Sequence, residues 1–167
     1  ITAMFLKISS SELLPRLLIF AFSFASVIGT YFLGKELYGK KVGIVATFLM
    51  SIFYINLFFS YRLLVELPSL TCFTFGAFFF WKYLKDNSDH ASLYIGAGTI
   101  AIGTLFRLNT VLILFVILLY LLITERLKFI RKKELWIASL IFILILSPYL
   151  IWGYLQFDGF VISQAAA

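Results

Sequence analysis

Long apolar runs separated by short polar stretches dominate the sequence. A transmembrane helix needs roughly 17–25 predominantly apolar residues, and four of the six runs reach that length. The other two are shorter and are separated only by the segment Arg107-Leu108-Asn109-Thr110. The runs extend approximately over Leu14–Gly34, Val42–Ser60, Pro68–Leu84, Leu93–Phe106, Val111–Thr124 and Leu135–Gln156. This pattern predicts an all-α, polytopic bundle of transmembrane helices.

The basic residues decide whether the two short runs form a hairpin or one long kinked helix. With about six spans, ten basic residues fall on one side of the membrane and four on the other. The larger group is Lys35, Lys40, Lys41, Lys82, Lys85, Arg126, Lys128, Arg131, Lys132 and Lys133, and the smaller is Lys7, Arg16, Arg62 and Arg107. Merging the two runs would bury Arg107 in hydrocarbon and move five residues of the larger group to the opposite side. The positive-inside rule therefore favours six spans, with the basic loops cytoplasmic.

Composition excludes a soluble protein. The chain is 62% hydrophobic and 13% charged, whereas soluble domains are about 45–50% apolar and about 25% charged. Ten basic and five acidic residues give the cytoplasmic side +5, and four and three give the outer side +1, so topology accounts for most of the net charge of +6. We therefore expect no nucleic-acid partner. We expect one transmembrane domain over residues 1–167, in a prokaryotic plasma membrane or the endoplasmic reticulum.

Three arginines and one glutamate are the strongest candidates for a functional site. Arg16, Arg62 and Arg107 each lie at the outer end of an apolar run, and Glu66 follows Arg62 by four residues. The cytoplasmic side uses eight lysines and two arginines, so arginine is selected at the outer ends. Its planar fork of donors suits phosphate and carboxylate. Charged residues at membrane level indicate a functional site by default, and this one would bind an anion, with Tyr61 and Asn109 as neighbouring hydrogen-bond partners.

Simpler explanations of these charges remain open at this point. The arginines could extend to the interface and pair with lipid headgroups. Arg62 and Glu66 could form a local salt bridge at i,i+4 spacing. Glu66 could also stabilise the start of a helix that begins at Pro68, with Leu67 held outside helical geometry by the proline.

Other local signals predict how the helices pack and exclude several chemistries. Gly96, Gly98 and Gly103 favour close packing of the fourth span against its neighbours. Ser147-Pro148 predicts a kink in the last span, with the Ser147 hydroxyl satisfying a freed backbone group. The single cysteine and single histidine form no metal-ligand cluster, and no phosphate-binding glycine loop is present. We expect neither a metal nor a cofactor.

Four stretches in order resemble the membrane half of the C-type glycosyltransferases. The sequence is most similar to the protein O-mannosyltransferase and aminoarabinose-transferase-like group, which uses polyprenyl-phosphate sugars. The stretches are Leu14-Pro15-Arg16-Leu17-Leu18, Tyr31–Gly39, Ser60–Glu66, and Gly98–Thr110 with its Thr104-Leu105-Phe106-Arg107. The resemblance extends from about Leu13 to Thr124. It implies part of a C-type glycosyltransferase fold.

The resemblance implies transfer of a sugar from a dolichyl- or undecaprenyl-phosphate donor to a protein, lipid or glycan acceptor at the extracytoplasmic face. Arg62 and Arg107, with Arg16, would bind the lipid phosphate, and Glu66 would position an arginine, the sugar or the acceptor. The family's catalytic base is an aspartate in the first outer loop, which has no counterpart here. We therefore expect a fragment that lacks the N-terminal span and that loop. Two other functions remain open, namely half of an anion transporter and a non-catalytic scaffold subunit.

Overall fold

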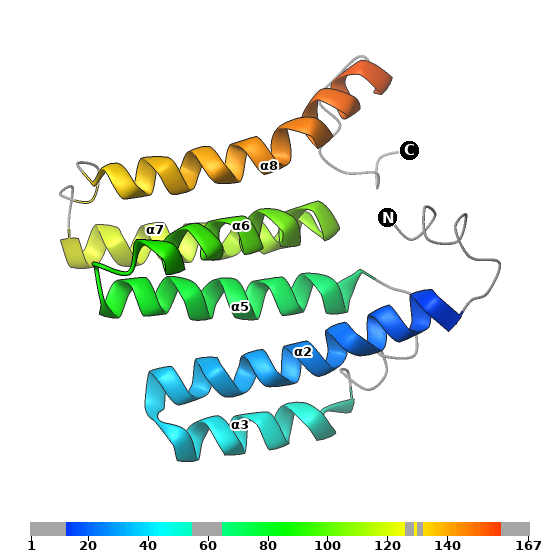
Figure 1. Ribbon diagram of the computed structural model, residues 1–167, viewed down its shortest axis with the longest axis vertical. Helices are drawn as coiled ribbons and strands as arrows, with labels where there is room; N and C mark the ends of the chain where they lie inside the picture. The colour runs from blue at the N-terminus through cyan, green and yellow to red at the C-terminus, as the bar shows by residue number, and fades with distance from the viewer. Residues whose placement is uncertain (1–12, 55–64, 126–128, 130–131, 158–167) are drawn as a thin grey trace.

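The computed structural model describes residues 13–54, 65–125, 129 and 132–157, and this part of the chain is all-helical (Figure 1). It contains six α-helices and one short 3₁₀ helix, η1. They are α2 (Leu13–Tyr38), α3 (Lys40–Ile52), α5 (Glu66–Lys85), α6 (His90–Phe106), η1 (Leu108–Val111), α7 (Leu112–Glu125) and α8 (Lys133–Phe157). The predicted helical bundle is confirmed.

The helices differ in whether they are long and apolar enough to span a membrane. The segments Leu14–Tyr38 and Lys133–Leu155 are long and apolar enough to cross a bilayer, and His90–Phe106 and Leu108–Thr124 are shorter apolar helices. The second apolar run was expected to remain helical to Ser60, but α3 ends at Ile52 and Phe53 is extended. The remainder of that run, from residue 55, lies outside the described residues.

The two short apolar runs form a hairpin, as the charge distribution predicted. α6 ends at Phe106, and Arg107 has an extended backbone (φ −153°, ψ 126°) before η1 and α7. Figure 1 shows that α7 returns to the end of the bundle where α8 begins, so consecutive helices alternate in direction. One end of the bundle therefore holds the starts of α2 and α5 and the turn after α6. The opposite end holds the α2–α3 and α5–α6 connections, the end of α7 and the start of α8.

Small residues allow α5 and α6 to pack closely. A Cβ atom added at Gly76 would lie 2.5 Å from Ile100 Cγ1, and one at Gly103 would lie 2.7 Å from Cys72 Cβ. Gly96 lies against the α5 backbone, with Phe80 N at 3.5 Å from its added Cβ. The predicted burial of the small-residue helix is thus confirmed for Gly96 and Gly103, whereas Gly98 is half-buried and faces Ile145 of α8.

The last helix accommodates its proline as the sequence predicted. Pro148 lies inside α8 and cannot donate to the carbonyl of Leu144, four residues earlier. Ser147 Oγ donates to that same carbonyl at 2.9 Å. Figure 1 shows that α8 changes direction in its C-terminal part. The serine hydroxyl therefore replaces the backbone hydrogen bond that the proline removes.

A capped turn connects α5 to α6 at the end of the bundle opposite Arg107. Asp89 accepts hydrogen bonds from Ser92 N (3.1 Å) and Ser92 Oγ (2.7 Å), and its carboxylate lies 2.9 Å from Lys82 Nζ. The Lys82 ammonium, followed by the Ser92 donors, lowers the pKa of Asp89 to about 2. The charged form of the carboxylate thus stabilises the start of α6.

The stability of this turn should depend on pH only under acid conditions. Because the pKa of Asp89 is lowered on folding from 3.8 to about 2, its contribution is fully present above about pH 4. It is lost as the pH falls towards 2. Asp89→Asn retains a capping side chain but removes the charge, so the protection of amides in the first turn of α6, taken relative to their intrinsic exchange rates at each pH, should become independent of pH in that window. An unchanged acid dependence in the variant would contradict this role of Asp89.

Candidate functional site

A pocket of about 630 Å³ lies at the end of the bundle that carries Arg107. Its lining comes from the C-terminal part of α3, the first turns of α5 and the turn after α6. The described lining residues are Met50, Phe53, Glu66, Leu67, Ser69, Leu70, Phe73, Arg107, Asn109 and Thr110. Half of these are apolar and come from α3 and α5, while both charged residues sit at helix ends. The pocket therefore joins an apolar wall to a charged and hydrogen-bonding wall.

Glu66 is placed by the start of α5. The expectation that this helix begins at Pro68 is wrong, because α5 begins at Glu66 and includes Leu67 and Pro68 in its first turn. A proline is tolerated there since the first N–H groups of a helix have no intrahelical partner. Leu67 is almost fully buried, and its packing outweighs the local preference of a residue before proline for extended geometry. Glu66 consequently occupies the first helical position, where the helix dipole favours a carboxylate.

Arg107 is placed by a hydrogen-bonded turn that ends α6. Its backbone N donates to Gly103 O at 3.0 Å, and its carbonyl accepts from Thr110 N at 3.1 Å. The buried Thr110 hydroxyl lies 3.2 Å from Gly103 O and 2.7 Å from Ser69 Oγ. Ser69 belongs to α5, so this hydroxyl pair connects the turn to the helix that carries Glu66. The two charged residues are therefore held by one polar network, although 41 residues separate them.

Arg107 and Glu66 form the ion pair of the pocket. Arg107 Nη1 donates to Glu66 Oε1 at 3.0 Å, and the two side chains are 46% and 28% exposed. The second carboxylate oxygen, Glu66 Oε2, is buried and has no hydrogen-bond partner within the part of the chain that the structure describes. The pair thus offers an oriented guanidinium inside the pocket.

The sequence-predicted site residues divide into three groups. Glu66, Arg107 and Asn109 come together at the pocket. Arg16 lies in the first turn of α2 and is exposed, but it is not among the described residues that line the pocket. Arg62 and Tyr61 lie outside the described residues. The predicted Arg62–Glu66 pair therefore stays a prediction, and the structure provides Arg107 as the partner of Glu66.

Sequence reasoning missed Ser69 and Thr110, the buried hydroxyls that fix the turn. Both are polar residues within three residues of a charged candidate, and this spacing was a usable signal. It also missed the apolar wall from α3, formed by Met50 and Phe53, for which the sequence holds no local signal. Among the described residues, no group of three or more histidine, cysteine, aspartate or glutamate side chains could hold a metal ion.

Comparison with known protein families assigns the chain. A family model described as dolichyl-phosphate-mannose-protein mannosyltransferase matches residues 1–152, nearly the whole sequence. The chain belongs to the dolichyl-phosphate-mannose-protein mannosyltransferase family. No curated protein and no solved structure matches it significantly.

Family membership gives the helical bundle a biochemical setting. The family indicates a membrane glycosyltransferase of the dolichyl-phosphate-mannose type. A lipid-linked sugar donor and membrane lipids are therefore its partners.

Proposed function

We propose that the pocket binds the phosphate of a polyprenyl-phosphate sugar and assists transfer of the sugar to an acceptor at the extracytoplasmic face. The single observation that carries the proposal is the Arg107–Glu66 pair, 3.0 Å apart, inside the pocket. Arginine is suited to this task because its fork of donors recognises phosphate oxygens in a bidentate manner. Only one of the Arg107 donors is used by Glu66, so others are available to a phosphate.

The reaction creates charge where this guanidinium is placed. An acceptor oxygen attacks the anomeric carbon of the sugar, the bond from that carbon to the phosphate oxygen breaks, and the acceptor proton passes to a general base. The lipid phosphate leaves with one additional negative charge. A pre-oriented guanidinium stabilises that charge more in the transition state than in the bound donor. Arg62, and more distantly Arg16, would add to the same positive field.

Glu66 has two proposed tasks, one for each carboxylate oxygen. Through Oε1 it fixes the position of the Arg107 guanidinium. Through the second oxygen it would position the sugar or the acceptor, because Glu66 lines the pocket in which they would bind. Asn109, exposed at the same pocket, is a further hydrogen-bond partner for the substrate.

The charge distribution supports an extracytoplasmic position for the site. The pocket lies at the end of the bundle opposite the lysine-rich connections, and the positive-inside rule places such connections in the cytoplasm. At that end, Lys40 and Lys41 are the first residues of α3, and Lys82 and Lys85 lie in the last turn of α5. The pocket would therefore open to the extracytoplasmic face, where the donor sugar and the acceptor meet.

Reconstitution of the full-length protein in liposomes tests this proposal. Lipid-linked mannose supplied in the membrane, with a hydroxylated peptide acceptor, should give glycosylated peptide, and free polyprenyl phosphate should inhibit competitively. Peptide enclosed on the lysine-rich side should remain unmodified. Uptake of an anionic solute without any sugar transfer would favour a transporter and overturn the proposal.

A further inference from the structure

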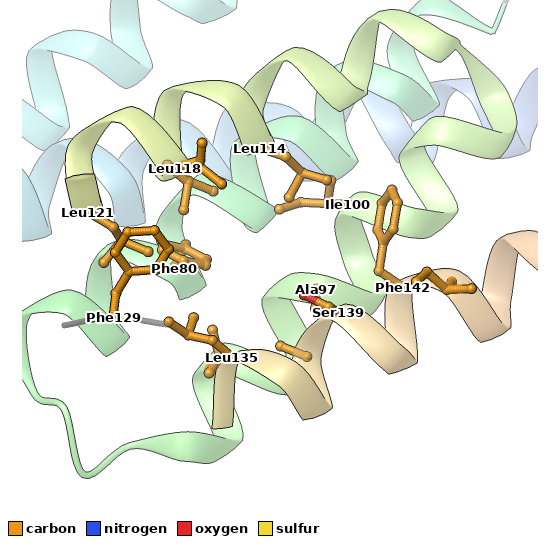
Figure 2. A pocket seen from close by; sticks show the side chains of 14 residues that line it. Phe80, Ala97, Ile100, Leu114, Leu118, Leu121, Phe129, Leu135, Ser139 and Phe142 are labelled. Atoms are coloured by element: carbon orange, nitrogen blue, oxygen red, sulfur yellow. The ribbon is translucent and has the colours of Figure 1, made fainter. Parts of the chain in front are cut away.

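A second groove lies between α6, α7 and α8 and has no part in the proposed catalytic site. Its volume is about 440 Å³, and thirteen of its fourteen lining residues are apolar, with Ser139 the exception. Figure 2 shows the groove opening between α7 on one side and α8 on the other, with Ala97 and Ile100 of α6 between them. Phe80, Leu121, Phe129 and Leu135 close one end.

That closed end lies beside basic side chains. Lys132 stands between the lining residues Phe129 and Leu135, and its backbone bonds to both of them, at 3.1 and 3.2 Å. Lys132 Nζ lies 6.0 Å from the centroid of the Tyr83 ring and donates to Asn87 Oδ1 at 3.0 Å. Lys133, the next residue, is exposed at the start of α8. The groove thus has a hydrocarbon-like interior and a cationic mouth.

The length of the groove fits one leaflet of a bilayer. On α8 the lining extends from Leu135 to Ile143, which is about 12 Å at 1.5 Å per residue. Half of a typical hydrocarbon core is about 15 Å. The cationic mouth lies at the end of α8 where headgroups would be found, and the apolar part extends from there towards the bilayer centre.

We propose that this groove binds an anionic phospholipid of the surrounding membrane. One acyl chain occupies the apolar interior, and the headgroup phosphate is held by the ammonium groups of Lys132 and Lys133. Basic pockets between membrane helices bind anionic headgroups by this combination of charge and apolar contact. The acyl chain would fill the space between α7 and α8 and so fix α7, whose first residues continue from the turn that holds Arg107.

Lipid retention by the purified full-length protein tests the proposal. The protein is placed in mixed micelles with phosphatidylglycerol and phosphatidylcholine of identical acyl chains, and bound lipid is counted by native mass spectrometry. The wild type should retain phosphatidylglycerol about tenfold more than phosphatidylcholine, corresponding to about 1.4 kcal/mol. Ser139→Trp fills the groove and should abolish retention of both lipids. Ile151→Trp, at an exposed position on the same helix outside the groove, should retain the wild-type pattern.

The headgroup contribution is separable from the groove itself. Lys132→Gln with Lys133→Gln should lower phosphatidylglycerol retention to the level of phosphatidylcholine. Lys40→Gln with Lys41→Gln removes the same charge from the same end of the bundle and should leave the preference intact. Equal retention by Ser139→Trp and Ile151→Trp would overturn the proposal. So would displacement of phosphatidylglycerol by polyprenyl phosphate.

Discussion

Arg107→Ala in the full-length protein should reduce sugar transfer by about 10²–10³-fold, the usual loss when one preorganised donor to a developing anion is removed. The physical reason is that Arg107 is the charged donor of the pocket and is already oriented by Glu66 at 3.0 Å. Arg107→Lys should recover only part of the activity, because an ammonium keeps the charge but lacks the bidentate fork. The rate of transfer from a lipid-linked sugar, measured at saturating donor, checks this.

A Glu66 variant tests whether this carboxylate orients the Arg107 guanidinium. Glu66→Gln keeps the size of the side chain and an acceptor oxygen but loses the charge that orients the guanidinium. Its rate of sugar transfer should therefore fall less than that of Arg107→Ala. Because the two residues act through one contact, the double variant should be little worse than Arg107→Ala alone. Lys41→Ala, a basic residue at the opposite end of the bundle, is the matched control. Undiminished transfer by Arg107→Ala, with normal membrane insertion, would rule out the proposed role.

Gly103→Ala should destabilise the bundle by about 1–3 kcal/mol, the usual cost of inserting a methyl group into a well-packed core. The added Cβ would lie 2.7 Å from Cys72 Cβ and 2.8 Å from Thr110 Cγ2, and neither atom is the free end of a flexible side chain. To relieve this steric overlap, α5 and α6 must separate or the turn that holds Arg107 must move. Thermal unfolding in detergent and the rate of sugar transfer should therefore fall together.

Gly98→Ala provides the control on the same helix. The nearest atom to an added Cβ there is Ile145 Cδ1 at 3.7 Å, an ordinary van der Waals contact at the end of a flexible side chain. This variant should unfold at or slightly above the wild-type temperature, since alanine is a better helix former than glycine. If the two alanine variants were equally stable, close packing of α5 on α6 at Gly103 would not be the constraint described.

Much of the fold follows from local sequence signals. The apolar runs and their charged boundaries predicted the helical bundle, and the cost of burying Arg107 in hydrocarbon predicted the hairpin between α6 and α7. The glycines of α6 predicted close packing, and Ser147-Pro148 predicted the replacement hydrogen bond to Leu144. Each of these depends on interactions within about one helical turn or on transfer from water to lipid, which are properties of the sequence itself.

Which residues line the pocket together could not be predicted from local signals. Sequence spacing paired Glu66 with Arg62, four residues away, because local neighbours are the only ones that spacing reveals. The structure pairs it with Arg107, which is 41 residues away, because the start of α5 and the end of α6 meet at one end of an antiparallel pair. Met50 and Phe53 reach the same pocket from α3, for which no local signal exists.

The sequence by itself thus determined that this protein is a membrane helical bundle with Arg107 and Glu66 at the end opposite the lysine-rich connections. Hydrophobic length and charge distribution are sufficient for that, because each helix meets the bilayer independently. Only the tertiary structure decided which of those charges face each other. That choice depends on how closely α5 and α6 approach through Gly76, Gly96 and Gly103, and on the buried Ser69–Thr110 hydrogen bond that places Arg107 against Glu66.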